Sequence, residues 1–306
     1  MNSQTEAANC EILVQIDFLK TGYCTHPEAI TIRGGQWNSI KFPALFALIH
    51  HPTHGNILYD TGYSERFFQE TARFPNRIYA LLTPVFFQSE DSAAQQLQQR
   101  GIAPESIRYI IISHFHADHI GGLGDFPAAT FVCAQSAYDA IKNRSGLSAL
   151  IAGFLPGLLP ADFAQRTQFV EASSQVDLSL DPFAVGFDLF GDRSLIAVEL
   201  PGHATGQLGL LLQDAHQEYF LVADACWSSQ AYRELAEPSA IAQLIFSNPS
   251  AYRTTLKQLH QLHQQRPDIR IVPTHCNDIF GGDILGSDFL DSDISGSDMP
   301  EKEDAK

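Results

Sequence analysis

Residues 110–122 read I-I-I-S-H-F-H-A-D-H-I-G-G, and the rest of the chain is best understood from this stretch outward. Its apolar beginning is typical of the end of a buried strand. Four side chains that can bind metal ions then follow within six positions: His114, His116, Asp118 and His119. Histidines two residues apart on an extended segment point to the same side. One cation cannot easily use all four groups with good geometry, whereas two adjacent cations can, so the stretch predicts a site for two metal ions.

A structural metal site and a histidine-rich loop without a chemical role are the alternatives to this prediction. Structural zinc sites are usually closed and rich in cysteine, with ligands in C-x-x-C pairs. The five cysteines of this chain are scattered and form no such pair. The pattern therefore favours a site that takes part in chemistry.

The composition is that of an ordinary globular protein with an acidic balance. The 306 residues are enough for one large α/β domain or two small ones, and 44% hydrophobic with 18% charged residues allows a sizeable core. The net charge is −16, from 35 acidic and 19 basic residues. Such a charge repels phosphate backbones, so we expect no nucleic-acid partner.

The ends of the chain and the cysteines bear on localisation. Residues 1–9 are polar and lack the basic start and apolar stretch of a signal peptide. No uninterrupted apolar run approaches the length that spans a membrane. An odd number of scattered cysteines does not resemble a disulfide framework. We therefore expect a reduced, cytoplasmic protein without a membrane span.

One domain is expected over residues 11–280, between a flexible N-terminus at 1–10 and a tail at 281–306. The tail is dominated by acidic residues, serine and glycine, a composition typical of disordered segments. Within the domain, apolar runs predict strands at 12–18, 44–49, 56–62, 107–112, 129–134, 194–200, 208–213, 219–222 and 270–273. Helices are predicted at 91–100, 136–142, 231–246 and 251–265. The first strands follow one another closely, which favours an antiparallel meander.

Three local features allow more than one interpretation. His50, His51 and His54 surround a turn, so we interpret them as surface residues rather than ligands. Asp60 ends a strand, where it can brace a metal-bound imidazole, hold a turn, or do both. Residues 145–163 are strongly apolar but broken by glycine and proline. They suit a lid or pocket wall beside the metals, a dimer contact or a membrane-touching segment, and these alternatives stay open.

Three more residues that can bind metal ions each follow an apolar strand: His203, Asp224 and His275. Because each comes just after a strand, all three can reach the same edge of a sheet. With the four residues above they make a set of five histidines and two aspartates. Such nitrogen and oxygen ligands suit zinc, iron or manganese and disfavour a soft-metal site.

Together these motifs resemble those of the metallo-β-lactamase superfamily. The resemblance rests on H-F-H-A-D-H at 114–119, P-G-H-A-T-G at 201–206, Asp224 and His275, with Asp60 matching the first acidic motif. They occur in the order found in the superfamily and extend over about residues 12–278. The resemblance implies an α/β fold, specifically an αββα sandwich of two mixed β-sheets flanked by helices.

The resemblance also implies a role for each residue of the site. One divalent ion, most simply zinc with iron or manganese as alternatives, would be bound by His114, His116 and His203. A second ion would be bound by Asp118, His119 and His275, and Asp224 would bridge the two. The nucleophile would be a hydroxide between the ions, and we hypothesise that Asp118 also passes a proton to the leaving group.

Within the superfamily, the chain looks most similar to the branch of quorum-quenching N-acyl homoserine lactonases. That similarity implies hydrolysis of an ester or lactone of a small, partly apolar substrate. The lactonases have a tyrosine three residues after the bridging aspartate, whereas this chain has Trp227. An indole N–H donates a hydrogen bond but is a weaker acid than a phenol, and Tyr232 is the nearby candidate to replace it.

The sequence also allows other functions. They are a thioester hydrolase resembling glyoxalase II, a phosphodiesterase, and a metal-binding regulatory protein of the same fold without turnover. In each enzymatic case the partner is a small-molecule substrate, and a homodimer is an open alternative to a monomer.

Overall fold

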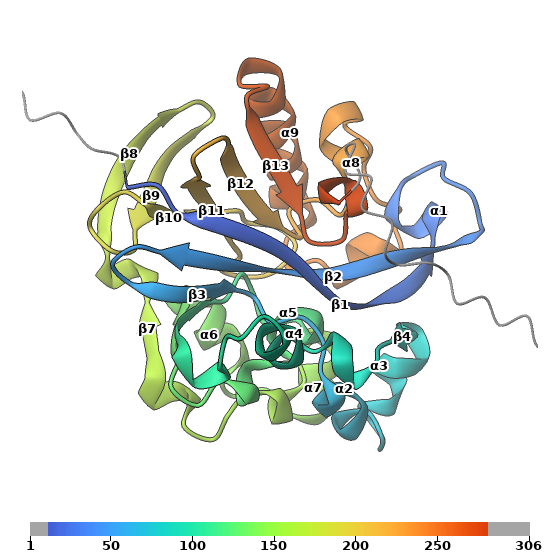
Figure 1. Cartoon of the computed structure of the whole chain (residues 1–306). Coiled ribbons are helices and arrows are strands. Elements are labelled where there is room, and N and C mark those ends of the chain that lie inside the picture. Colours follow the sequence, from blue (N-terminus) through green and yellow to red (C-terminus); the bar gives the residue numbers. More distant parts are fainter. Residues whose placement is uncertain (1–11, 281–306) are drawn as a thin grey trace, which may run out of the picture.

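Two mixed β-sheets pack face to face in the computed structural model, which describes residues 12–280 (Figure 1). The strand order is β4-β1-β2-β3-β5-β6-β7 in one sheet and β13-β12-β11-β10-β9-β8 in the other. Helices α2 and α4–α7 cover the first sheet, and α8 and α9 cover the second (Figure 1). This arrangement confirms the predicted αββα sandwich. The predicted N-terminal segment 1–10 and acidic tail 281–306 lie outside the described residues.

The first sheet combines an antiparallel half with a parallel half. Its strands are β1 (Gln15–Pro27), β2 (Ser39–His51), β3 (Gly55–Tyr59), β4 (Val85–Phe86), β5 (Ile107–Ile111), β6 (Thr130–Cys133) and β7 (Thr167–Phe169). Strands β1, β2 and β3 pair antiparallel, as the predicted meander requires. Strands β3, β5, β6 and β7 pair in parallel, so their carboxyl ends lie at one edge of the sheet. The helices of this half are α1 (Glu28–Thr31), α2 (Glu65–Glu70), α3 (Arg77–Leu82), α4 (Ala93–Gln99), α5 (Ala117–Ile120), α6 (Gln135–Ile141) and α7 (Gly146–Ile151).

The second sheet is antiparallel except for its last pair. Its strands are β8 (Ser174–Leu180), β9 (Phe183–Asp188), β10 (Leu195–Glu199), β11 (Leu208–Gln213), β12 (Glu218–Ala223) and β13 (Ile269–Pro273). Helices α8 (Ser229–Glu234) and α9 (Pro249–Gln265) cover it. Because β12 and β13 are parallel, Asp224 and His275 leave the sheet at the same edge.

The predicted helix over 231–246 is wrong as one continuous element. Helix α8 ends at Glu234, and Leu235 follows with a φ of 53°, the left-handed conformation that terminates a helix. Only a short 3₁₀ turn, Ala242–Ile245, forms further on. Pro238 stands between the two pieces and has no N–H for a helical hydrogen bond.

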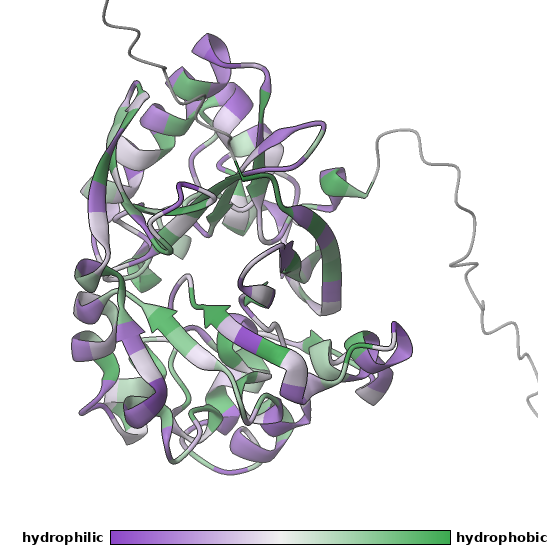
Figure 2. Cartoon of the chain, turned by 60° about the vertical axis from the view of Figure 1, so that its left-hand side comes forward, coloured by the Kyte–Doolittle hydropathy of each residue, from purple (hydrophilic) through white to green (hydrophobic). Residues whose placement is uncertain are grey.

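The hydrophobic core lies between the two sheets and beneath the helices. Figure 2 shows hydrophobic residues concentrated on the strands and hydrophilic residues on the outer helices and loops. Strand β2 is buried from Phe42 to Ile49 because both of its faces are covered. Helix α9 buries Tyr252, Leu256 and Leu259 along one side, and the Asn248 side chain caps its first turn. Among the described residues, every helix is too short or too polar to cross a membrane.

Candidate metal centre

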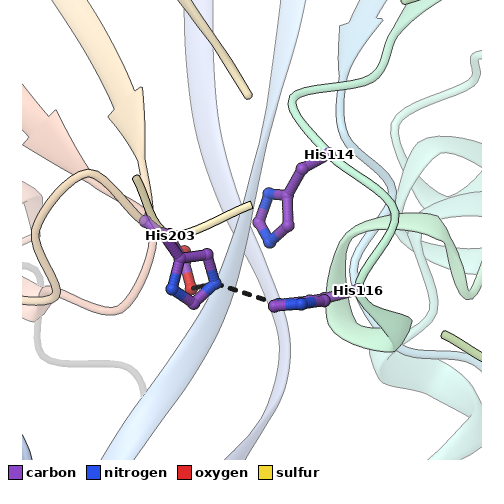
Figure 3. A group of neighbouring side chains, drawn as sticks. His114, His116 and His203 are labelled. Carbon is purple, nitrogen blue, oxygen red and sulfur yellow. Dashed lines mark hydrogen bonds and ion pairs between the residues drawn. The ribbon is translucent and has the colours of Figure 1, made fainter. Parts of the chain in front are cut away.

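The loops that leave the strand ends bring the predicted ligands together between the sheets. His114, His116, His203 and Asp224 form one group in which the potential ligand atoms lie within 4.8 Å of one another. Figure 3 shows the three imidazoles of this group pointing toward one another from two separate loops. Nε2 of His203 lies 2.9 Å from Nδ1 of His116 and 3.3 Å from Oδ2 of Asp224. Residues nearly 90 positions apart in sequence therefore meet at one point, as the strand-end positions predicted.

A second group consists of Asp118, His119 and His275, again within 4.8 Å. Nε2 of His275 lies 3.4 Å from Oδ2 of Asp118, and Nε2 of His119 lies 3.8 Å from the same oxygen. The side chains of His119 and Asp118 are buried or nearly so, and that of His275 is only 8% exposed. The two groups match the division into two triads that the family resemblance implied.

The Asp224 carboxylate lies between the two groups. Its Oδ1 is 3.3 Å from Nε2 of His119, and its Oδ2 is 3.3 Å from Nε2 of His203 and 3.2 Å from Nε2 of His275. Asp224 follows Ala223, which adopts a φ of 46°, an unfavourable conformation for a residue with a side chain. The backbone is thus strained at the point where it presents this carboxylate to both groups.

Several buried polar atoms of the site have no hydrogen-bond partner among the described residues. They are Nε2 of His114, Nε2 of His119, Nδ1 of His203 and Oδ1 of Asp224. Buried polar atoms are normally hydrogen-bonded, so such a concentration needs an explanation. Imidazole nitrogens and carboxylate oxygens at this spacing are ligands for zinc, iron or manganese. The residues therefore fit divalent metal ions.

In two of the histidine rings, the nitrogen that would face away from a metal ion is hydrogen-bonded to the protein. Nδ1 of His119 donates to Oδ2 of Asp60 at 2.7 Å, and Nδ1 of His275 donates to the carbonyl oxygen of Pro43 at 2.8 Å. A histidine that donates from Nδ1 presents Nε2 to a metal ion, and such outer partners fix the orientation of the ring. Asp60 is fully buried and adopts a φ of 60° at the end of β3. It braces an imidazole and forms the turn, so both interpretations of this residue hold.

Burial and charge act differently on the individual groups. Burial lowers the pKa of His114 and of His203 well below the ordinary value, which favours the neutral, metal-binding form. Burial also lowers the pKa of His275, but Asp224 and Asp118 outweigh it and raise that pKa to about 9. A proton on such an imidazole occupies the position that a metal ion takes when it binds.

The two aromatic residues proposed near the site differ in their placement. Nε1 of Trp227 donates to Oδ2 of Asp224 at 2.9 Å, and its ring packs against His203 and Phe246. Tyr232 is not brought to the metal groups: its hydroxyl points to the carbonyl oxygen of Ile271 at 3.5 Å, below the second sheet. The structure thus places Trp227, and not Tyr232, at the centre.

The interpretation of the hairpin histidines as surface residues is wrong for His51. His51 is 3% exposed, and it forms a third potential ligand group with His54 and Asp192. Its Nδ1 accepts the backbone N–H groups of Thr53 and His54, each at 3.1 Å. Nε2 must then carry the proton of the neutral ring, so it is a donor and is not available to a metal ion.

Residues 145–163 approach the metal centre at Gly153. They contain α7 and a loop in which Gly153 adopts a φ of +65° against the ring of His116. A Cβ at Gly153 would lie 2.6 Å from Cδ2 of His116, so no larger residue fits there without a shift. Leu147 and Ile151 of α7 are 55% and 76% exposed. The segment therefore presents apolar side chains to solvent on the His116 side of the centre.

Comparisons with known proteins agree with this geometry. A family model described as the metallo-beta-lactamase superfamily matches residues 42–275. The N-acyl homoserine lactonase AttM of Azorhizobium caulinodans is 26% identical over 220 residues, which cover 71% of this chain and 77% of the relative. A probable metallo-hydrolase of Mycobacterium tuberculosis is 27% identical over 239 residues, covering 74% of this chain and 72% of the relative.

Solved structures show the same fold. An N-acyl homoserine lactone hydrolase with the product N-hexanoyl-L-homoserine bound at its catalytic metal centre superimposes with a TM-score of 0.68. The alignment covers 88% of this chain and 95% of that chain at 18% sequence identity. At this level of identity the likeness establishes the fold.

Proposed function

The chain belongs to the metallo-β-lactamase superfamily and is a metal-dependent hydrolase, and we propose that it uses two divalent ions to open an ester or lactone of a small, partly apolar substrate. The observation that carries this proposal is the Asp224 carboxylate, which contacts imidazoles of both ligand groups. A carboxylate with two oxygens in that position is suited to bridging two cations. The N-acyl homoserine lactonase relatives make lactones the first substrates to test.

We assign three ligand residues to each ion as follows, in addition to the shared Asp224. His114, His116 and His203 would hold one ion, and His119 and His275 would hold the other together with Asp118. Zinc is our first choice of metal because neutral imidazole and carboxylate ligands suit it, with iron or manganese as alternatives. When bound, the ions would lower the pKa of water toward about 7 and polarise the substrate carbonyl.

The protein's own residues position these groups and move the proton. Hydrolysis adds the hydroxyl of water to the acyl carbon and delivers a proton to the leaving oxygen. Asp118 is the group best placed for that proton, because its carboxylate lies in the centre and is 8% exposed. The Trp227 N–H holds one oxygen of Asp224 and so limits its rotation.

Apolar segments on both sides of the centre support a substrate with an acyl chain. The loop after helix α7 borders His116 at Gly153, and α7 itself exposes Ile151. On the other side, the N–H of Ser247 donates to the carbonyl oxygen of His203 at 2.9 Å, and nearby Leu244 is 83% exposed. Apolar residues exposed around a polar centre are typical of a ligand-binding site.

The test is a substrate panel with the metal-loaded protein. N-acyl homoserine lactones with short and long acyl chains, thioesters, phosphodiesters and β-lactams would be offered to the wild type. The D224A variant would serve as the control. We expect lactone hydrolysis that requires metal and is lost in D224A. Hydrolysis of the phosphodiesters alone would overturn the proposal, as would lactone hydrolysis unaffected by D224A.

A further inference from the structure

Ser113 is a fully buried residue of the centre that is not a potential metal ligand. It follows β5 directly before the histidine cluster. Its backbone N–H donates to Oδ1 of Asp60 at 2.8 Å, and its hydroxyl donates to Oδ2 of the same carboxylate at 2.7 Å. Asp60 and Ser113 therefore form a closed pair that holds the ends of the parallel strands β3 and β5 together.

The same hydroxyl contacts two histidines. Oγ of Ser113 lies 3.0 Å from Nδ1 of His114 and 3.2 Å from Nδ1 of His119. A carboxylate can only accept hydrogen bonds, so the single hydroxyl proton goes to Asp60 and the oxygen lone pairs face the two rings. Both rings are then held with Nδ1 toward this pair, and both have an Nε2 atom without a partner among the described residues.

These two histidines belong to different ligand groups. His114 lies with His116 and His203, whereas His119 lies with Asp118 and His275. We propose that the Ser113 hydroxyl is a positioning group that couples the two metal sites, so that an ion bound in one raises the affinity of the other. This inference rests on the proposed function, because it requires that the centre bind two ions.

The coupling follows from the geometry of the shared hydroxyl. An ion at Nε2 of His114 fixes that ring, and with it the orientation of Ser113 and of the Asp60 carboxylate. The ring of His119 is then already held in the orientation that the second ion needs, so less ordering accompanies the second binding step. Thermodynamic linkage requires the effect to be the same in the other direction. The two metal groups also share Asp224, but Asp224 is itself a ligand, whereas removal of the Ser113 hydroxyl leaves every ligand in place.

The experiment is a zinc titration of the chelator-treated full-length chain by calorimetry, with the bound zinc measured independently. We expect the wild type to take up two ions with the second bound nearly as tightly as the first. In S113A, the affinity for the second ion should fall about 10- to 100-fold, the usual effect of losing an outer partner of a metal ligand, so that two steps separate. S113T keeps the hydroxyl, so in this variant the second ion should again bind nearly as tightly as the first.

Ser194 offers a matched control. It is 3% exposed, and its hydroxyl lies 2.8 Å from Nε2 of His51, outside the metal centre. S194A should leave zinc binding unchanged. If S113A does not fold, D60N tests the same coupling, because the amide replaces an oxygen that accepts from both Ser113 and His119.

Each outcome of the titration is informative. An equal loss of affinity for both ions in S113A would show a general structural role and would overturn the coupling, while leaving the proposed function intact. Unchanged zinc binding in S113A would also overturn it. Failure of the wild type to bind two ions would remove both the coupling and the proposed dinuclear function.

Discussion

Within residues 12–280, histidine and aspartate gather in two clusters, the metal centre and the hairpin cluster of His51, His54 and Asp192, and the buried ring nitrogens that lack a hydrogen-bond partner lie in the metal centre. In the hairpin cluster, Nδ1 of His51 accepts two backbone N–H groups, and Nε2 points to Ser194 at 2.8 Å and to Asp192 at 3.3 Å. In the metal centre, Nδ1 of His119 donates to Asp60. The direction of the hydrogen bond at Nδ1 sets the tautomer, and the tautomer determines whether Nε2 can bind a metal ion.

In the hairpin cluster, both ring nitrogens of the buried His51 have protein partners, so this ring needs no ion. The ring of His54 stacks on Phe190 with the ring centroids 4.1 Å apart, and the Ser194 hydroxyl accepts from His51 while it donates to Asp192. These contacts tie the turn between β2 and β3 to the loop between β9 and β10. Proximity of histidine and aspartate is therefore insufficient evidence for a metal site, and the outer hydrogen bonds must be examined as well.

The largest expected effect comes from removing one histidine of the centre. H114A deletes a ring nitrogen, Nε2, that has no hydrogen-bond partner among the described residues, and it should abolish binding of one ion. It should also reduce kcat/KM by at least about 10³-fold, because uncoordinated water has a pKa of about 15.7 and supplies little hydroxide. Metal content by elemental analysis and lactone hydrolysis would measure this. H51A is the control and should retain the full metal content. Equal metal loss in both variants would show that the two clusters do not differ as we describe.

A smaller effect is expected from the carboxylate that we propose as the proton carrier. D118N, assayed at saturating metal, should lower kcat by about 10²- to 10⁴-fold, the usual contribution of a general acid or base. Asp192 is the corresponding carboxylate of the hairpin cluster, and D192N should leave kcat unchanged. Normal turnover in D118N with both ions bound would refute the role of Asp118.

The hairpin cluster should instead contribute to stability. H51A removes the acceptor of two part-buried backbone N–H groups, those of Thr53 and His54, and the donor to the buried Ser194 oxygen. An unsatisfied buried group costs about 1–3 kcal/mol, and the two N–H groups contribute less because water reaches them, so the free energy of unfolding should fall by about this amount. Urea unfolding of the metal-free wild type and variant would measure the difference. A decrease in the free energy of unfolding below about 0.5 kcal/mol would mean that the cluster does not stabilise the hairpin.

The sequence was sufficient to predict that the ligands converge, but not the tautomer and hydrogen-bond partners of each histidine ring. His203, Asp224 and His275 each follow an apolar strand, and neighbouring strand ends necessarily meet at a sheet edge. Asp60 was identified for the same reason. These predictions depended on local patterns, which are visible in one sequence.

Features that depend on distant partners were missed. The burial of His51 is produced by Phe190 and Ser194, about 140 residues away, and a turn composition does not indicate it. Ser113 carries no metal-ligand signal of its own, although its position directly before the first histidine was available. The β8–β9 hairpin was not predicted, since its strands are half exposed and weakly apolar.

Trp227 provides the smallest and most specific test of the difference between the clusters. Its indole N–H is an outer hydrogen bond to a metal-centre carboxylate, and W227F removes that bond while keeping an aromatic ring against His203. A net contribution of about 0.5–1.5 kcal/mol corresponds to a loss of about two- to tenfold in zinc affinity. Trp37 is 74% exposed, so W37F should not change zinc affinity and leaves Trp227 as the only tryptophan. Zinc should then alter the fluorescence of the W37F protein, and a spectrum that does not respond to zinc would place Trp227 away from the ions.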